Sequence, residues 1–457
     1  MKSKAPVLVI ATLASFIVPF TISSVVVAIP SISNEFSMDA SVVGWIPTAY
    51  LLTVSMFLVP FGKIADIYGR KKIFFAGTVV YTIASFLLAI SNSSLMFILA
   101  RALQGLGGSM TAGTSIAMLI SVYEPRERGF VLGINVSAVY TGLSLGPLIG
   151  GVLVNYFGWR SIFWANLPLG LVIIALTLIL LKGREWAFAE DKKFDITGSI
   201  IYCVMLPLFI YGFSVITSIK GVGFVSAGIA ALVIFVKWEL GSDNPVLDLR
   251  LFRENITFRY SSLATLINYS AASATTFLLS LYLQYIKAIG PKEAGIILMS
   301  QPIVQAVFSP LAGKLSDRIE PRIIASLGMG MTCLGLFILS FLSENTPFYF
   351  IITNLMLMGF GFALFSSPNT NAVMGSVGKE SYGVASSIVS TMRGLGQMAS
   401  MSIAMLVFSV LMGNVKILPG TYPALLKCIK ILFMIFSGFS LAGVFASLSR
   451  GKLHKTG

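Results

Sequence analysis

The chain has 457 residues, of which 56% are hydrophobic and only 11% are charged, and its formal net charge is +14. A soluble domain typically carries about a quarter of its residues as Asp, Glu, Lys or Arg. Together with a mean hydropathy of +0.89, this composition excludes an ordinary water-soluble domain and predicts a chain surrounded mainly by lipid.

The residues that carry most enzyme and metal chemistry are scarce. The single histidine, His454, lies in a basic tail, and Cys203, Cys333 and Cys428 lie in or beside apolar runs without metal or redox spacing. We therefore expect no metal site and no cofactor. The sequence also has no phosphate-binding loop and no nucleophile–base set, which argues against an enzyme and against an ATP-driven pump.

Apolar runs recur along the whole chain, and about 20 residues are enough to cross a bilayer. Fourteen spans are predicted, at Val7–Pro30, Ser41–Phe61, Ile73–Ser91, Leu95–Ile120, Phe130–Tyr156, Ser161–Leu181, Ile196–Ile219, Gly221–Val236, Tyr260–Ile286, Ala294–Gly313, Ile323–Ser343, Thr346–Pro368, Gly383–Leu411 and Ile431–Ser449. Only Gly221–Val236 is short. Twelve spans, with two helices lying elsewhere, is the alternative.

The distribution of Lys and Arg predicts the orientation of these spans. With the N-terminus inside, 23 of the 32 basic residues fall in cytoplasmic segments, seven fall outside, and Arg101 and Arg393 fall within spans. This positive-inside pattern predicts a multi-pass cell-membrane protein with both termini in the cytoplasm. Topology and contact with the lipid bilayer account for the basic charge, so nucleic acid is not an expected partner.

A weak internal repeat divides the chain into two halves. Residues 62–66 read GKIAD and residues 313–317 read GKLSD, each at the end of the second span of its half. We predict an all-α membrane protein with an N-terminal six-helix bundle at residues 1–182 and a C-terminal one at 257–457. An insert with two additional helices occupies residues 183–256. Secondary transporters are commonly built from such repeats, with the substrate site between them near the midplane.

The loop after the second span carries glycines and charges in the order Gly62, Asp66, Gly69 and Arg70, followed by two lysines. Glycine permits a tight turn between helices. An acidic side chain in such a loop can face a helix N-terminus and its dipole. The alternative is a basic loop that serves topology alone.

The fourth span contains an ionisable residue, Arg101, in the sequence RALQGLGG. A charge inside a span costs at least about 2.5–3.5 kcal/mol on insertion scales and is functional by default. Arg101 begins about seven residues into its apolar run, counted from the outer side. Its side chain could therefore reach the membrane interface instead, which is the alternative.

The fifth span carries a glycine pattern at Gly142, Gly146, Pro147, Gly150 and Gly151. Glycines four residues apart line one face of a helix and permit close approach to a neighbouring backbone. Proline removes a backbone donor and bends the helix. The pattern predicts a tightly packed hinge, with a general helix-packing face as the alternative.

These motifs resemble the major facilitator superfamily and, within it, the fourteen-span drug:proton antiporter family of the multidrug efflux type. The likeness extends to residues 159–170, WRSIFWANLPLG, and to residues 193–198 and 245–253 of the insert. The resemblance implies a major facilitator fold and the proton gradient as driving force. It implies Asp66 and Arg70 in a cytoplasmic latch between the halves, and Arg101 in proton coupling. By the same resemblance, the glycine pattern from Gly142 to Gly151 marks an antiporter.

The first span departs from this family. Many members carry an aspartate there, in a pattern like LDxTxxNxALP, whereas this chain has Thr21 at the acidic position and Val26 at the asparagine position. None of the 18 acidic residues falls near the middle of a predicted span. Cation selection and proton antiport in a low-dielectric site both favour an acidic group. Its absence favours a neutral, zwitterionic or anionic hydrophobic substrate. Proton coupling would then depend on Asp66 or on titration of the substrate itself.

Polar residues on otherwise apolar spans are the candidates for lining a substrate cavity. They are Thr21, Gln104, Asn135, Tyr140, Asn268, Tyr269, Gln301, Gln305, Asn354, Asn369 and Asn371. Each of them alone is more often an interhelical hydrogen-bonding residue than a ligand contact. Arg393 is interpreted as an interface or packing charge.

The leading hypothesis is a secondary-active transporter that exports small hydrophobic or drug-like molecules by alternating access, as a monomer. A dedicated exporter of an endogenous metabolite or lipid is one alternative. An uptake symporter of the same superfamily is another, and the glycine pattern argues against it.

Overall fold

The computed structural model describes residues 4–183, 185–186, 194–216, 218–242, 245–247, 252, 255–316, 318–377, 382–413 and 415–451. In these ranges the regular structure is helical, apart from one isolated β-bridge between Asp39 and Lys416. Fourteen helical segments are long and apolar enough to cross a membrane, which confirms the predicted count. The span expected to be short extends over Ile219–Gly241, so the twelve-span alternative has no support.

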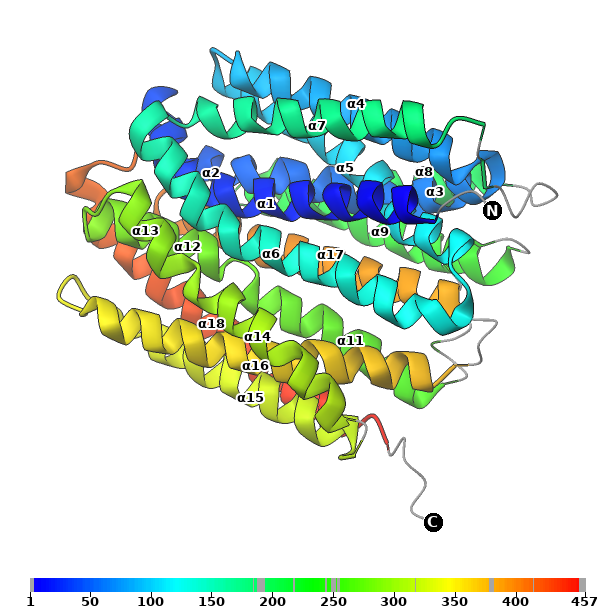
Figure 1. The fold of residues 1–457 in the computed structure, drawn as a ribbon. Helices are drawn as coiled ribbons and strands as arrows, with labels where there is room; N and C mark the ends of the chain where they lie inside the picture. Colours follow the sequence, from blue (N-terminus) through cyan, green and yellow to red (C-terminus); the bar gives the residue numbers. More distant parts are fainter. Residues whose placement is uncertain are drawn as a thin grey trace.

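The N-terminal bundle holds six spans (Figure 1). Its helices are α1 (Ala5–Glu35), α2 (Ala40–Val43), α3 (Trp45–Tyr68), α4 (Arg70–Ala89), α5 (Ser94–Val122), α6 (Pro125–Phe157) and α7 (Arg160–Leu180). Helices satisfy their own backbone hydrogen bonds, as a lipid environment requires. Ser93 caps α5 by accepting a hydrogen bond from the Met96 amide, and Pro125 occupies the first turn of α6.

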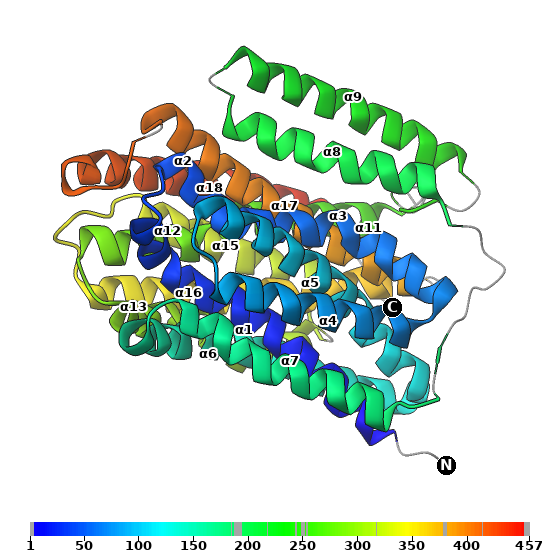
Figure 2. The same cartoon turned by 90° about the horizontal axis from the view of Figure 1, so that it is seen from above.

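The insert forms a helical pair, α8 (Ile196–Ser214) and α9 (Ile219–Gly241). Asp195 caps α8 by accepting a hydrogen bond from the Gly198 amide. Figure 2 shows this pair at the edge of the molecule, where α8 packs against α3 and α17 (Tyr382–Leu411). The Tyr202 hydroxyl donates to the Ser55 carbonyl, which ties the insert to the N-terminal bundle.

The C-terminal bundle contains the other six spans, two of which are interrupted. Its remaining helices are α11 (Ile256–Ala272), α12 (Thr275–Leu281), the π-helical η1 (Tyr282–Ile286), α13 (Pro291–Leu298), α14 (Ser300–Ser316), α15 (Pro321–Leu339), α16 (Phe348–Gly375), the short 3₁₀ turn η3 (Pro419–Thr421) and α18 (Tyr422–Leu448). At the break between α11 and α12, the Ala274 amide donates to the Ser400 hydroxyl at 3.0 Å. A side chain thus satisfies a backbone group that the broken helix leaves free.

The start of α1 and the end of α18 lie at the same end of the molecule (Figure 1). We call this end the termini end and the opposite end the far end. A single apolar core at the far end contains residues of both bundles, from Val25–Ile32 of α1 to Phe277–Tyr285 of α12 and η1. At the termini end, the core around Val7 and Phe74 contains residues of the N-terminal half alone.

Two small cores at the termini end, around Ala264 and Ala312, belong to the C-terminal bundle alone. A further core joins α3 to the insert and to α11, α16 and α17. The apolar interior therefore unites the bundles at the far end. At the termini end it divides between them, except along the flank covered by the insert.

Candidate functional site

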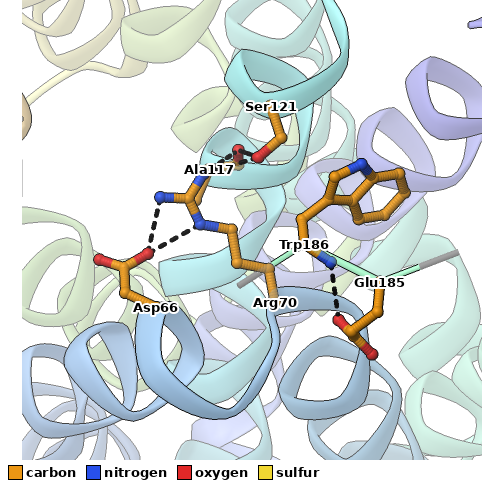
Figure 3. Close-up of polar contacts among 6 residues, drawn as sticks. All are labelled: Asp66, Arg70, Ala117, Ser121, Glu185 and Trp186. Atoms are coloured by element: carbon orange, nitrogen blue, oxygen red, sulfur yellow. Dashed lines mark hydrogen bonds and ion pairs between the residues drawn. The ribbon is translucent and has the colours of Figure 1, made fainter. Parts of the chain in front are cut away.

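The loop between α3 and α4 is a charged turn held against α5 (Figure 3). Asp66 forms an ion pair with Arg70 at 2.6 Å, and Arg70 donates to the Ala117 carbonyl at 2.9 Å and to the Ser121 hydroxyl at 2.6 Å. These contacts all lie within the N-terminal bundle. The predicted latch residues are together in the structure, but these bonds do not reach the C-terminal bundle.

Glycine is required at one position of this loop. Gly69 has φ +114°, and a Cβ there would lie 2.5 Å from the Glu185 carboxyl carbon. Glu185 accepts a hydrogen bond from the Lys71 amide, and the Trp186 carbonyl accepts one from the Arg70 amide. The turn is thereby fixed to the segment after α7. A Cβ at Gly62 would meet open space, so packing does not explain that glycine.

Arg101 is buried, with 1% of its surface exposed. Its guanidinium donates to the Gln104 side-chain oxygen at 2.6 Å and to the Ile46 carbonyl at 3.2 Å, and it lies 4.7 Å from the centroid of the Tyr50 ring. Gln104 in turn donates to the Ser85 hydroxyl at 2.9 Å. The alternative in which Arg101 reaches the membrane interface is wrong, because the guanidinium is held inside the bundle by neutral acceptors.

The glycine pattern of α6 packs against two helices. A Cβ at Gly142 would lie 2.6 Å from the Phe16 carbonyl oxygen, and one at Gly146 would clash with the Ser23 hydroxyl. A Cβ at Gly150 would lie 2.8 Å from the Cα of Ser24. The Ser24 hydroxyl also donates to the Gly146 carbonyl at 2.9 Å. The backbones of α1 and α6 therefore approach closely over about two helical turns.

The same pattern also joins the two bundles. A Cβ at Gly151 would lie 2.5 Å from the Pro291 carbonyl oxygen of α13, and a Cβ at Gly295 of α13 would clash with the Pro147 carbonyl. The Ser280 hydroxyl and the Gln284 amide of the C-terminal bundle donate to carbonyl groups of α1, at 2.7 Å and 2.9 Å. Small residues and backbone acceptors thus close the far end.

Five of the predicted cavity residues make hydrogen bonds within or between helices instead. The Thr21 hydroxyl donates to the Ile17 carbonyl, and Gln104 holds Arg101. The amide groups of the other three donate to neighbouring helices: Asn135 to Ser15, Asn354 to Gly335 and Asn369 to Thr265. Asn369 also accepts from the buried Arg450 at 2.7 Å. These five residues are therefore hydrogen-bonding residues of the helices, as the alternative interpretation predicted.

The other five predicted cavity residues differ in how far their polar groups are paired, and the Tyr269 side chain hydrogen-bonds with Ser366. Both amide atoms of Asn268 are buried without a hydrogen-bond partner. Gln301 and Gln305 are half-buried on α14, and Tyr140 and Tyr269 are half-buried on α6 and α11. Asn371, named with them from the sequence, donates to the Ser316 hydroxyl at 2.7 Å.

Arg393, interpreted from the sequence as an interface or packing charge, lies beside tyrosines of both bundles. Its guanidinium lies 5.2 Å from the centroid of the Tyr269 ring, and Tyr140 of the other bundle is close enough to interact electrostatically with both. The Nε atom of Arg393 is buried without a hydrogen-bond partner. A charge with an unpaired buried donor differs from a packing charge, and the sequence gives no signal of this difference.

A cavity of about 530 Å³ opens between the bundles at the far end. Asn34 of α1, Gln284 and Tyr285 of η1, and Lys416 contribute to its lining. None of the predicted cavity residues lines it. The predicted residues and the far-end cavity are thus separate features of the interface between the bundles.

The model of the Major Facilitator Superfamily matches residues 11–238 and 261–455. The chain belongs to this superfamily. The riboflavin transporter RibZ of Clostridioides difficile (strain 630) is 30% identical over 398 residues, which cover 86% of each chain. The multidrug resistance protein Stp of Mycobacterium tuberculosis (strain CDC 1551 / Oshkosh) is 31% identical over 379 residues, covering 81% of this chain and 69% of Stp.

Other superfamily relatives include the tetracenomycin C resistance and export protein of Streptomyces glaucescens, 25% identical over 83% of this chain and 71% of its own. A similar fold occurs in a bacterial homologue of the human lysosomal transporter Spinster, whose crystal structure is in an inward-facing and occupied conformation. The TM-score is 0.68 with 15% identity, and the match covers 98% of this chain and 97% of the homologue. The peptide transporter POT also has a similar fold, with a TM-score of 0.71 and 14% identity over 95% of this chain and 93% of POT. These findings identify a superfamily transporter of the multidrug efflux type rather than an enzyme.

Proposed function

We propose that the protein exports small hydrophobic, drug-like molecules across the cell membrane by alternating access, coupled to proton entry. The packing of α6 carries this proposal. Its glycine pattern lets the α6 backbone approach the backbones of α1 and α13 closely, as at Gly151 and Pro291. This close packing makes a leak-resistant contact between the bundles. Relatives named as multidrug resistance and export proteins support the same function.

Alternating access requires two bundles that close at one end while they part at the other. With both termini cytoplasmic, as the basic residues predict, the far end is the outer end. The shared core from Val25 to Tyr285 then closes the outer side, and the division between the Val7 core and the Ala264 core lies inside. The described arrangement supports an inward-facing state.

Proton coupling needs a different group from the aspartate typical of the first span. Thr21 donates to a carbonyl of its own helix and cannot titrate. Asp66 is the candidate, with 42% of its side chain exposed beside Arg70. In the described arrangement Asp66 forms its ion pair with Arg70 of the same bundle, and closure on the cytoplasmic side would bring this loop to the C-terminal bundle. No cofactor is needed beyond the proton gradient.

The test is transport in inside-out membrane vesicles with an imposed acidic interior, followed with a fluorescent pH probe. Cationic, neutral and anionic hydrophobic compounds are added in turn. We expect at least one class to collapse the gradient in vesicles with the wild-type chain. The collapse should be absent with Gly151→Leu, which cannot pack against Pro291, and slower with Asp66→Asn.

Two results would overturn parts of this proposal. Accumulation of a labelled compound with an undisturbed pH gradient would exclude proton antiport. Proton-driven loss of the compound from the vesicle interior would reveal an uptake symporter, the alternative that the glycine pattern disfavours.

A second candidate is the transport of one endogenous aromatic metabolite. It is favoured by the relative named as a riboflavin transporter, which matches 86% of each chain. Competition in the vesicle assay distinguishes the two functions. An exporter of many compounds is inhibited by several unrelated scaffolds at similar concentrations, whereas a dedicated transporter responds to one scaffold.

A further inference from the structure

Arg393 and Tyr269 of the C-terminal bundle lie side by side within the length of their helices, and Tyr140 of the N-terminal bundle is within electrostatic range of both. Tyr140 is the sixteenth of the 33 residues of α6, Arg393 the twelfth of the 30 residues of α17, and Tyr269 the fourteenth of the 31 residues of the Ile256–Ile286 span. All three are half-buried, and they belong to helices on both sides of the bundle interface. This depth is where transporters of this architecture bind substrates.

Arg393 differs from Arg101 and Arg450, the arginines that are fully buried among the described residues. Arg101 donates to Gln104 and to the Ile46 carbonyl. Arg450 donates to Asn369, Ser261 and Ser447. Arg393 makes no hydrogen bond or ion pair with the described residues, and its buried Nε is unpaired. A desolvated guanidinium without an acceptor is costly, and the cost is repaid when a ligand supplies the acceptor.

The neighbours of Arg393 indicate what kind of ligand fits. Its guanidinium lies over the Tyr269 ring, which packs edge-on against Phe362 with centroids 5.8 Å apart. A second planar group can stack beside such rings. None of the 18 acidic residues of the chain lies in the middle of a span to attract a cation. The site therefore has a positive charge, aromatic surfaces and two phenol groups.

We propose that Arg393, Tyr269 and Tyr140 form a substrate-binding subsite that selects aromatic molecules carrying an anionic group. The guanidinium binds the anion through charge-assisted hydrogen bonds, and the tyrosine rings stack on the aromatic part. Because Tyr140 comes from the opposite bundle, such a ligand contacts both bundles at once. This inference rests on the proposed transport function, for which it names the substrate class.

The test measures binding to the purified full-length protein in lipid nanodiscs. Three fluorescent probes share one ring system: a coumarin carboxylate, its neutral primary amide and its cationic aminoethyl amide. We expect the wild-type protein to bind the carboxylate at least about tenfold more tightly than the cationic probe. Arg393→Gln should weaken carboxylate binding by about 10- to 100-fold, the range of a charge-assisted hydrogen bond, and change amide binding less than about threefold.

Arg259 offers a matched control. It is exposed at the termini end of α11, and its guanidinium lies 5.4 Å from the centroid of the Tyr260 ring, nearly the distance between Arg393 and Tyr269. Arg259→Gln should leave all three affinities unchanged. Arg393→Lys keeps the charge and should retain part of the preference for the carboxylate, and it serves as the second variant should Arg393→Gln fail to fold.

Binding of the cationic probe as tightly as the carboxylate overturns the proposal, as does the absence of binding by all three probes. An equal loss of amide and carboxylate affinity in Arg393→Gln also overturns it. Failure of the proposed transport function gives a different result. If the wild-type protein binds the carboxylate in nanodiscs but moves no compound in vesicles, the subsite is supported and the transport function is wrong.

Discussion

Arg101 and Arg393 are both membrane-embedded arginines stacked on a tyrosine, yet their surroundings differ. Arg101 lies in the first third of α5 with the Gln104 side-chain oxygen and the Ile46 carbonyl as acceptors, and it is 1% exposed. Arg393 lies near the middle of α17 at the bundle interface and has an unpaired Nε. Arg101 is therefore bonded inside one bundle, whereas Arg393 has a donor that is available to a ligand.

The difference matters because the first span of this chain, over Val7–Pro30, carries no acidic residue. A charge satisfied by fixed neutral acceptors orders the helices around it, since α3, α4 and α5 are linked through Arg101, Gln104 and Ser85. A charge without acceptors adds little to the fold and is free for a ligand. Substitutions at the two positions should thus separate stability from binding.

The largest effect is expected for Arg101→Ala. The substitution leaves a cavity, removes one of the hydrogen bonds to the Ile46 carbonyl and leaves the buried Gln104 oxygen without its donor, which alone costs about 1–3 kcal/mol. Transport should be lost and the melting temperature in detergent should fall by several degrees. A variant that melts and transports like the wild type would contradict the positioning role of Arg101.

A smaller loss of stability is expected for Gln104→Leu. It removes one acceptor of Arg101 and the donor to the Ser85 hydroxyl, while the Ile46 carbonyl and the Tyr50 ring remain. We expect about 1–3 kcal/mol of destabilisation, measured by thermal melting beside Arg101→Ala. The double variant should lose less than the sum of the single ones, because the two side chains act through one network. Full additivity would show that the network is not coupled.

Arg393→Ala should lower stability by less than about 1 kcal/mol, because the described part of the chain gives Arg393 no hydrogen bond to lose. Melting in detergent, without added ligand, measures this directly. The same variant should transport anionic aromatic compounds poorly. A drop in melting temperature as large as that of Arg101→Ala would show that Arg393 stabilises the fold, as Arg101 does, and would contradict the difference between them.

The smallest effect is expected at the exposed contact of Lys4 with Glu127, which lie 2.6 Å apart. The hydrogen bond from Lys4 lowers the pKa of the Glu127 carboxyl below its ordinary value and raises that of the Lys4 ammonium. The contribution of Glu127 to stability is therefore present at neutral pH and is lost as the pH falls through its lowered pKa. The wild type should melt slightly above Glu127→Gln at about pH 7 and by a smaller margin at about pH 3. An equal difference at both values would contradict the ion pair.

The fold was largely predictable from the sequence because lipid imposes simple rules. Apolar runs of sufficient length mark the spans, and the glycines at Gly142, Gly146 and Gly150 mark a close helix contact that the structure contains. The partner of that contact was not predictable, since Phe16, Ser23 and Ser24 contribute mainly backbone and small polar atoms without a distinctive pattern.

The candidate site was predictable only as a set of residue types. Asn135 and Asn354 satisfy their amides on Ser15 and on the Gly335 carbonyl, partners that leave no trace in the sequence. Arg101 and Arg393 are each followed by a glutamine, Gln104 three residues on and Gln397 four residues on. Only the first forms a hydrogen bond with its arginine, because side-chain direction depends on the surrounding helices.

The most direct test of the contrast is the reactivity of the two guanidinium groups. The purified protein is treated with phenylglyoxal in nanodiscs, and modification of each arginine is quantified by peptide mass spectrometry. The account predicts that Arg393 reacts, that the coumarin carboxylate protects it, and that Arg101 reacts only after unfolding. Modification of Arg101 at the same rate as Arg393, or an Arg393 unaffected by the carboxylate, would contradict it.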